Sequence, residues 1–213
     1  MVRVTSLRVS FPNQRSRPAR YLGVLVSCAA LACPIYAAGP FVLLLGPPGS
    51  GRTTQAELLK KDLGLQVISA DDLIARNAQI FQKNRIPTLQ GVDPHLDPAL
   101  NELVEEALKT ADLSKGVVLD GYPASKVQGD FLAGVREKFD LPRAVVIHLN
   151  ISDAALRKRL KKQNRPDLEQ QLKDYHREFD FVRQYFPEAD IRTVDASKRP
   201  AAVKKQIRQL LKK

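Results

Sequence analysis

The feature that most constrains this chain is a glycine- and proline-rich loop directly after a short apolar run. Phe41–Leu45 reads FVLLL, as a fully buried strand of a parallel sheet does, and residues 46–53 read GPPGSGRT. The loop matches the phosphate-binding pattern G-x-x-x-x-G-K-[ST] at every fixed position except the lysine. Glycines let the backbone curl so that N–H groups point at phosphate oxygens, and the following helix adds its positive end. The sequence therefore predicts a strand–loop–helix unit that binds nucleotide phosphates; a plain Gly-Pro turn is the structural alternative.

Arg52 departs from this pattern, because lysine is usual at its position. Arginine keeps the positive charge, but its planar guanidinium is bulkier than an ammonium and need not fit a loop shaped for lysine. We expect nucleotide binding to survive and phosphoryl transfer to slow. The residues expected to bind the donor nucleotide here are Gly46, Gly49, Ser50, Gly51, Arg52, Thr53 and Thr54, and Thr53 is also a candidate ligand of Mg²⁺.

Short apolar runs alternate with helical patterns along the rest of the chain. The runs are residues 66–68, 117–119, 144–149 and 191–194. One helical stripe covers residues 100–108 after Asp97-Pro98, which we expect to form a cap and a first turn; another covers residues 203–211. This alternation predicts an α/β domain over residues 40–213, with a parallel sheet of about five strands and helices on both faces. Ligands bind such sheets at the carboxyl ends of the strands.

Residues 1–39 differ in composition from the remainder. They hold five arginines, no Asp or Glu, and the apolar run YLGVLVSCAALA at residues 21–32. A basic region, a short apolar stretch and small residues are typical of a secretory signal peptide, and an Arg- and Ser-rich segment without acids also fits an organelle transit peptide. The run is too short for an ordinary transmembrane helix. Two alternatives remain: the start of translation is misassigned, in which case we expect a cytoplasmic protein, or the apolar run is a surface helix or an extra strand.

The overall charge is basic, with 34 Lys and Arg against 23 Asp and Glu, a net +11. Such a surplus is typical of proteins that meet nucleic acid, phosphates or anionic membranes. Five of these charges lie in residues 1–39, however, and aromatic residues make up only 6% of the chain. The sequence carries no nucleic-acid recognition motif. We expect nucleotide phosphates as partners, no nucleic acid, and no stable membrane span in the domain.

Further motifs follow in order along the chain. Leu119-Asp120-Gly121-Tyr122-Pro123 ends the third apolar run, and Gln128 lies eight positions beyond Asp120. Together with the loop GPPGSGRTTQAE, they resemble the adenylate kinase and nucleoside monophosphate kinase family, from about Phe41 to the end of the chain. The weaker matches are Ser69-Ala-Asp-Asp72, Arg159 in AALRKRL, Arg165-Pro-Asp167, Tyr175-His176 and Val194-Asp195.

The resemblance implies a P-loop nucleoside-kinase-type fold, a monomer, and the Mg²⁺-dependent reaction of ATP and AMP to two ADP. Asp120 would hold the hydrated Mg²⁺, Gln128 would read the acceptor adenine, and Gly121 would let that base approach. Arg159 would lie against the donor adenine, and Arg165 would reach the transferred phosphate, so the implied catalytic set is Arg52, Asp120 and Arg165. The other residues implied at the acceptor site are Ser69, Asp72 and Arg76.

Each of these residues also has a structural interpretation. Ser125-x-x-Gln128 and Ser69-x-x-Asp72 both match a helix capping box. Asp120 is equally suited to capping a turn. The arginines at 159 and 165 lie among lysines and are consistent with a solvated basic face.

The chain also lacks several arginines that the family pattern contains. Ala124, Ala75 and Gln163 occupy three such positions (Arg76 is adjacent to Ala75), Gln171 lies near a fourth, and the lid is reduced to about residues 161–165. If each lost charge contact cost ~2 kcal/mol, three would cost about four orders of magnitude in rate. A shortened lid also protects the reaction less from water.

We therefore expect a weak adenylate kinase. The main alternative is a catalytically degenerate nucleotide-binding protein of the same fold. A small phosphate-loop kinase acting on a sugar or an acid is a third possibility, against which the Asp-Gly-Tyr-Pro motif and Gln128 argue.

Overall fold

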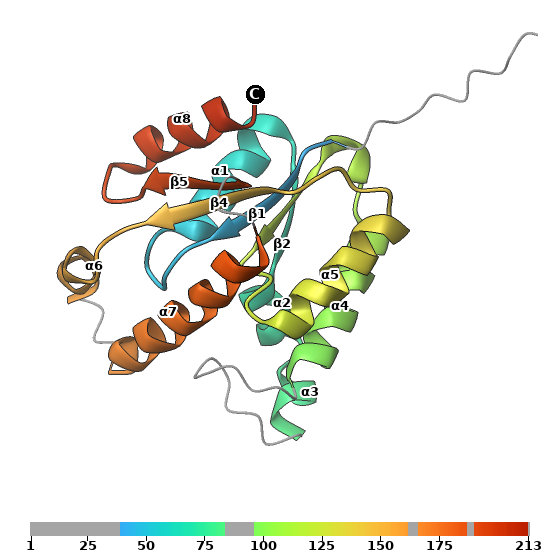
Figure 1. Ribbon diagram of the computed structural model, residues 1–213, viewed down its shortest axis with the longest axis horizontal. Helices are drawn as coiled ribbons and strands as arrows, with labels where there is room; N and C mark the ends of the chain where they lie inside the picture. The colour runs from blue at the N-terminus through green and yellow to red at the C-terminus, as the bar shows by residue number, and fades with distance from the viewer. Residues whose placement is uncertain (1–38, 84–95, 162–165, 187–189, 213) are drawn as a thin grey trace, which may run out of the picture. The chain divides into compact units, whose positions relative to one another are not determined.

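The structure is a computed structural model that describes residues 39–83, 96–161, 166–186 and 190–212. Its centre is a parallel sheet in the order β2-β3-β1-β4-β5 (Figure 1). The strands are β1 (Phe41–Leu45), β2 (Gln66–Ser69), β3 (Val117–Asp120), β4 (Val145–Asn150) and β5 (Ile191–Asp195). All five expected strands are confirmed, and β2 to β5 each end one residue later than predicted.

That extra residue matters most in β3, because it makes Asp120 the last residue of the strand. Asp120 pairs in register with Leu44 of β1 on one side and with Ser69 of β2 on the other. The ends of three adjacent strands therefore meet at one edge of the sheet, which is where a parallel sheet binds ligands.

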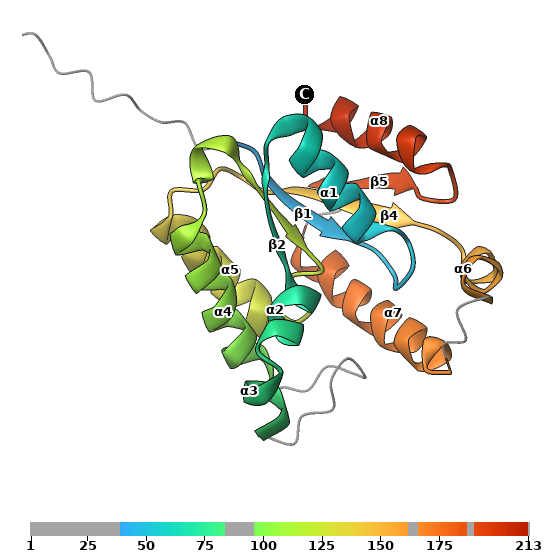
Figure 2. The same ribbon diagram turned by 180° about the vertical axis from the view of Figure 1, so that it is seen from behind.

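Helices cover both faces of the sheet (Figures 1 and 2). They are α1 (Arg52–Leu63), α2 (Ala70–Arg76), α3 (Ala78–Lys83), α4 (Leu96–Thr110), α5 (Lys126–Lys138), α6 (Asp153–Leu160), α7 (Leu168–Tyr185) and α8 (Pro200–Leu210). A 3₁₀ turn spans Leu113–Lys115. The two expected helical stripes correspond to α4 and α8, and the expected α/β class is confirmed.

The central strand β1 shows how the sequence creates two cores. Phe41, Leu43 and Leu45 pack with α4, α5 and α7, whereas Val42 and Leu44 pack with α1, α6 and α8. Successive side chains of a strand point to opposite faces, so a continuous apolar run is what a strand buried on both faces requires. Complete burial of each such side chain contributes roughly 2 kcal/mol to stability.

His148 of β4 attaches α7 to the sheet. Its ring lies 3.8 Å from that of Phe179, and its Nε2 is 2.8 Å from the Tyr175 hydroxyl. Burial, with a smaller contribution from Arg183, lowers the pKa of His148 to about 4, so the ring is neutral at physiological pH. This contact places one face of α7 over the carboxyl ends of the strands.

The prediction that Asp97-Pro98 supplies the cap of α4 is wrong in detail. The helix begins at Leu96, which puts Asp97 inside the first turn. Its carboxylate instead accepts hydrogen bonds from Gln128 of α5 and from Ser125, the N-cap of that helix.

In the described part of the chain, none of the helices has the length and apolar character needed to span a membrane. Residues 1–38 lie outside the described residues, so the expectations for the N-terminal segment remain predictions. Arg165 and Gln163 also lie outside the described residues, so the expectations for them remain predictions as well.

Candidate active site

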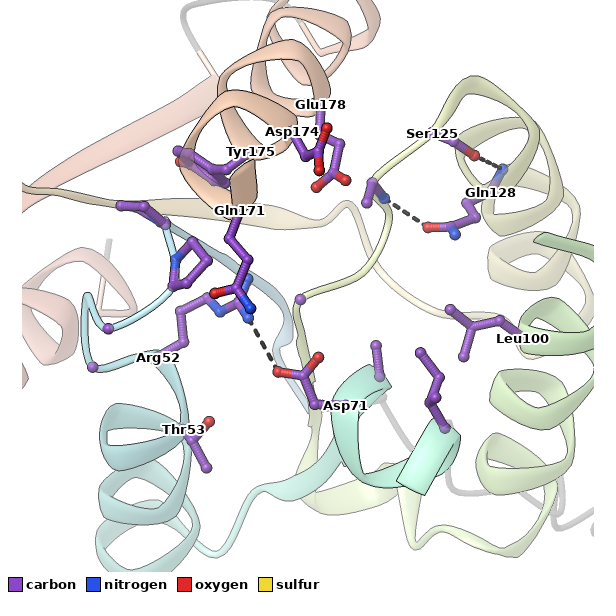
Figure 3. Close-up of a pocket in the computed structure, with 18 of the residues that line it drawn as sticks. Arg52, Thr53, Asp71, Leu100, Ser125, Gln128, Gln171, Asp174, Tyr175 and Glu178 are labelled. Carbon is purple, nitrogen blue, oxygen red and sulfur yellow. Dashed lines mark hydrogen bonds and ion pairs between the residues drawn. The ribbon is translucent and has the colours of Figure 1, made fainter. Parts of the chain in front are cut away.

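A cavity of about 490 Å³ opens at the carboxyl ends of the strands (Figure 3). One wall is the loop after β1 with the start of α1, and the others come from α2, α4, the β3–α5 connection and α7. Its described lining residues include Pro47, Gly49, Arg52, Thr53, Thr54, Asp71, Asp97, Leu100, Gly121, Ala124, Ser125, Gln128, Gln171, Asp174, Tyr175 and Glu178. Five of the seven predicted donor residues of the loop thus share one cavity with the predicted acceptor residue Gln128, whereas Gly46 and Ser50 are not among its described lining residues.

The loop has the conformation that its glycines predict. Gly49 has φ +80°, and a Cβ added there would lie 2.6 Å from Cδ1 of Leu160. Gly51, at φ +99°, is the N-cap of α1 and offers no side chain to bond the first-turn N–H groups. These groups and the helix dipole therefore remain directed at an incoming phosphate.

Arg52 is held by three protein oxygens. Its Nη1 donates to the Gly46 carbonyl at 3.0 Å, its Nη2 lies 3.3 Å from Oδ2 of Asp71, and its Nε lies 3.3 Å from Oδ1 of Asp120. Only 19% of the Arg52 side chain is exposed. The guanidinium also lies against Gly121, where an added Cβ would be 3.4 Å from its atoms. A donor phosphate must therefore compete with two carboxylates for this cation.

Asp120 and Thr53 provide the oxygen chemistry that Mg²⁺ prefers. The Thr53 hydroxyl donates to Oδ2 of Asp120 at 3.0 Å, while the buried Oδ1 has the Arg52 ion pair but no hydrogen bond. Burial raises the pKa of Asp120, and Arg52 and Thr53 oppose that rise.

In the described residues, no group of three or more acidic, His or Cys side chains is arranged to hold a metal. Two protein ligands nevertheless fit Mg²⁺, since this ion usually keeps several waters and takes further oxygens from phosphates.

The opposite wall carries Gln128 in a hydrogen-bonded polar cluster. Its Nε2 donates to Oδ1 of Asp97 at 2.7 Å, and its Oε1 accepts from the Ala124 backbone N–H at 2.7 Å. Ser125 caps α5 through the Gln128 N–H and donates its hydroxyl to Oδ2 of Asp97 at 2.5 Å. The capping-box interpretation is therefore correct for Ser125, and the Gln128 side chain still lines the cavity.

The charge of the cavity is opposite to what an acceptor phosphate needs. Among its described lining residues Arg52 is the single cation, against carboxylates of Asp71, Asp97, Asp174 and Glu178. Figure 3 shows the last two projecting from α7 into the cavity. Burial raises the pKa of Glu178 to about 7, with Arg52 acting against it and Asp174 adding to it.

Three residues implied at the acceptor site lie elsewhere. Ser69 accepts a hydrogen bond from the Asp72 N–H at 3.4 Å and so caps α2, while Asp72 pairs with Arg76 at 3.9 Å on the exposed side of that helix. None of the three is among the described cavity-lining residues. Asp71 faces the cavity instead, because neighbouring helix positions point about 100° apart at 3.6 residues per turn.

Arg159 contacts the phosphate loop from outside the cavity. Its guanidinium donates to the carbonyls of Gly49 and Ser50 at 3.2 and 3.3 Å, and to that of Ala196 at 2.8 Å. In this structure it braces the loop rather than facing an open base site, and the stacking role that the resemblance implies remains a prediction.

The residues that sequence reasoning missed are Asp71, Asp97, Asp174 and Glu178. The two residues on α7, Asp174 and Glu178, could have been found from a pattern in the sequence. Gln171, Asp174, Tyr175 and Glu178 recur at helical spacing on one polar face, which is the face that lines the cavity. For Asp97 the only sequence signal was its place before an apolar stripe, which predicted a cap.

A phosphate loop after the central strand of a five-stranded parallel sheet, with a cavity at the strand ends, defines a P-loop kinase fold. The fold is similar to that of a solved gluconokinase from Sinorhizobium meliloti 1021, with a TM-score of 0.57 at 16% identity over 83% of this chain and 93% of that one.

Sequence comparison gives the family. The adenylate kinase family model matches residues 44–191. The adenylate kinases of Mycobacterium tuberculosis and Mycolicibacterium smegmatis are 34% and 35% identical to this chain, over 73% of this chain and 90% of each of theirs. The chain belongs to the adenylate kinase family, as its motifs predicted.

Proposed function

We propose that this protein transfers the terminal phosphoryl group of ATP to a nucleoside monophosphate, with AMP as the principal acceptor and Mg²⁺ as cofactor, at a reduced rate. The observation that carries the proposal is the pairing of an intact phosphate loop with the Gln128 amide across one cavity. Family membership supports nucleotide phosphoryl transfer in general.

In this reaction an oxygen of the AMP phosphate attacks the terminal phosphorus of ATP. A new P–O bond forms, the bond to the ADP leaving group breaks, and two ADP molecules result. The acceptor oxygen is already anionic, so the protein needs no general base; it positions the two phosphates and stabilises charge.

Different residues of the cavity would bind the donor phosphates, hold Mg²⁺ and supply positive charge. The N–H groups of the loop and of the first turn of α1 would hold the donor phosphates. Thr53 and Asp120 would hold Mg²⁺, which supplies Lewis-acid neutralisation of the phosphates when bound. Arg52 would exchange its ion pair with Asp71 for the donor phosphates, since Asp71 is half exposed and the easier partner to give up.

The reduced rate follows from the acceptor side of the cavity. Its described lining has no cation to meet a second phosphate, and it carries the carboxylates of Glu178 and of Asp174, which pairs with Arg177 at 2.8 Å. Charge stabilisation of the moving phosphoryl group is usually the largest catalytic contribution, so its partial loss lowers turnover more than binding.

A second candidate function is nucleotide binding without useful turnover. The ion pairs that hold Arg52 favour it, because they occupy the loop cation that would otherwise serve the reaction.

Two measurements on the full chain separate these functions. Isothermal titration with ATP and with AMP measures binding, and a coupled assay of ADP formation measures turnover. We expect binding of both nucleotides with slow, Mg²⁺-dependent turnover. Binding without turnover would establish the second function, and absence of AMP binding would refute the acceptor assignment.

A further inference from the structure

We propose that Asp97 is the positioning residue that sets purine specificity, by fixing which way round the Gln128 amide faces the acceptor base. This inference rests on the proposed acceptor site and concerns a residue to which neither the family motifs nor the sequence assigned a role in base recognition.

The argument begins with the symmetry of an amide. A glutamine side chain carries a donor NH₂ and an acceptor oxygen on groups of nearly equal size, so rotation by half a turn exchanges them at little steric cost. A glutamine that is free to rotate therefore presents either pattern to a ligand. Its choice is determined only by the neighbours that bond the far side of the amide.

In this chain both neighbours demand the same orientation. Asp97 is 3% exposed, and an ionised carboxylate only accepts hydrogen bonds, so it requires the NH₂ of Gln128 at its 2.7 Å contact. The Ala124 backbone N–H only donates, so it requires the amide oxygen at its own 2.7 Å contact. Rotation would bring two acceptors together on one side and two donors on the other.

The Asp97 bond is the stronger of the two constraints. It joins a carboxylate to an amide in a buried place, and charge-assisted hydrogen bonds are roughly twice as strong as neutral ones. The Ser125 hydroxyl donates to the other carboxylate oxygen at 2.5 Å, so both oxygens of Asp97 have partners. Gln128 is left with one N–H and one oxygen lone pair for a ligand.

Adenine and the 6-oxopurines present opposite hydrogen-bonding patterns to the free N–H and oxygen of the Gln128 amide. Adenine offers an acceptor at N1 beside a donor amino group at C6, whereas a 6-oxopurine offers a donor N1–H beside an acceptor O6. For a base held in one pose, an amide of fixed orientation accepts one pattern and opposes the other. Because the amide cannot rotate, AMP and inosine monophosphate (IMP), which have nearly the same shape, become distinguishable.

The test compares equilibrium binding of AMP and IMP to the full chain by titration calorimetry. We expect the wild type to prefer AMP. In Asp97→Asn the carboxylate becomes an amide that can donate as well as accept, and we expect the AMP-over-IMP ratio to fall by about tenfold or more, the worth of one charge-assisted hydrogen bond. Asp130→Asn, the same substitution on the exposed face of α5, should retain the wild-type ratio.

A second variant separates orientation from packing. Ser125→Ala removes the helix cap and one bond of Asp97 but leaves the contact between Asp97 and Gln128, so both affinities should weaken in parallel. Thermal unfolding of each variant verifies that it is folded. A folded Asp97→Asn protein that keeps the wild-type ratio would overturn the inference alone, whereas a wild type that binds neither monophosphate would overturn the acceptor site with it.

If Asp97→Asn does not fold, NMR of the wild-type protein still tests whether the Gln128 amide has a fixed orientation. The ¹⁵N-labelled side-chain amide of Gln128 has one proton bonded to Asp97 and one facing the cavity. AMP should shift the cavity-facing proton and IMP should leave it in place at equal saturation. Equal shifts with both ligands would show that the amide is not fixed.

Discussion

Two halves of the cavity differ in construction: the proposed donor half, formed by the phosphate loop and the start of α1, and the proposed acceptor half, formed by the Gln128 wall and α7. The donor half is built from backbone N–H groups, supported by glycines at positive φ and by the start of α1. The proposed acceptor half depends on side chains, and there Ala124 and the carboxylates of Asp174 and Glu178 line the cavity. A backbone site persists while side chains change, whereas a site of side-chain charges is lost by single substitutions. The comparison suggests that binding of ATP has been retained more fully than transfer.

The most direct way to break the donor half is Gly49→Val. A branched side chain at φ +80° costs about 1–2 kcal/mol, and its Cβ would also collide with Leu160. We expect ATP affinity, measured by calorimetry, to fall at least about 100-fold, or about 2.8 kcal/mol. Gly134→Val, at a helical position with open space around it, is the matched control and should bind as the wild type does. Unchanged affinity in both variants would mean that the loop does not hold ATP.

The acceptor half should be repairable by one charge. Ala124→Arg places a guanidinium on the cavity wall without removing the backbone N–H that holds Gln128. We expect kcat/KM for AMP in a coupled ADP assay to rise by about 10- to 100-fold, the usual range for one charge contact to a moving phosphoryl group. Ala133→Arg adds the same charge on the exposed face of α5 and should give no such gain. Equal gains from both would assign the effect to net charge.

Arg52→Lys tests whether the loop cation limits transfer. A single ammonium cannot contact Gly46, Asp71 and Asp120 together, so it is freer to follow the donor phosphates. We expect turnover to rise by about tenfold while the dissociation constant of ATP changes by less than about threefold. A turnover equal to or below that of the wild type would show that arginine serves the reaction as well as lysine.

The smallest expected effect concerns Glu178 and pH. Its pKa in the folded protein is about 7, above the usual 4.5, so ionisation destabilises the fold progressively as pH rises from 4.5 through 7. Glu178→Gln should therefore melt higher than the wild type at pH 8, by roughly 2–4 °C if about 1 kcal/mol is regained, and at the same temperature near pH 4.5. Glu137→Gln, exposed on α5, is the control. An equal shift at both pH values would assign the effect to packing.

The fold was predictable because its signals are local. The run Phe41–Leu45 must be buried on both faces, and glycines at fixed spacing after it leave few alternatives to a phosphate loop. The identity of the side chains that line the cavity was less predictable, because it depends on how each helix is rotated about its own axis. One position separates Asp71, which pairs with Arg52, from Asp72, which faces solvent, and only Asp72 occupies the marked position of the capping motif. The partners of Asp97 lie 28 and 31 residues away, and no short-range pattern carries that information.

The brace formed by Arg159 has a consequence for how the protein is made. The residues it joins are 110 and 37 positions from it in the chain, on opposite sides. On the ribosome, the loop of residues 46–53 emerges early, but the carbonyl of Ala196 becomes available only when most of the chain has been synthesised. Contacts between distant residues form late because they must first overcome loop-closure entropy. The phosphate loop is therefore translated before the other motifs of the domain but acquires its full set of contacts late.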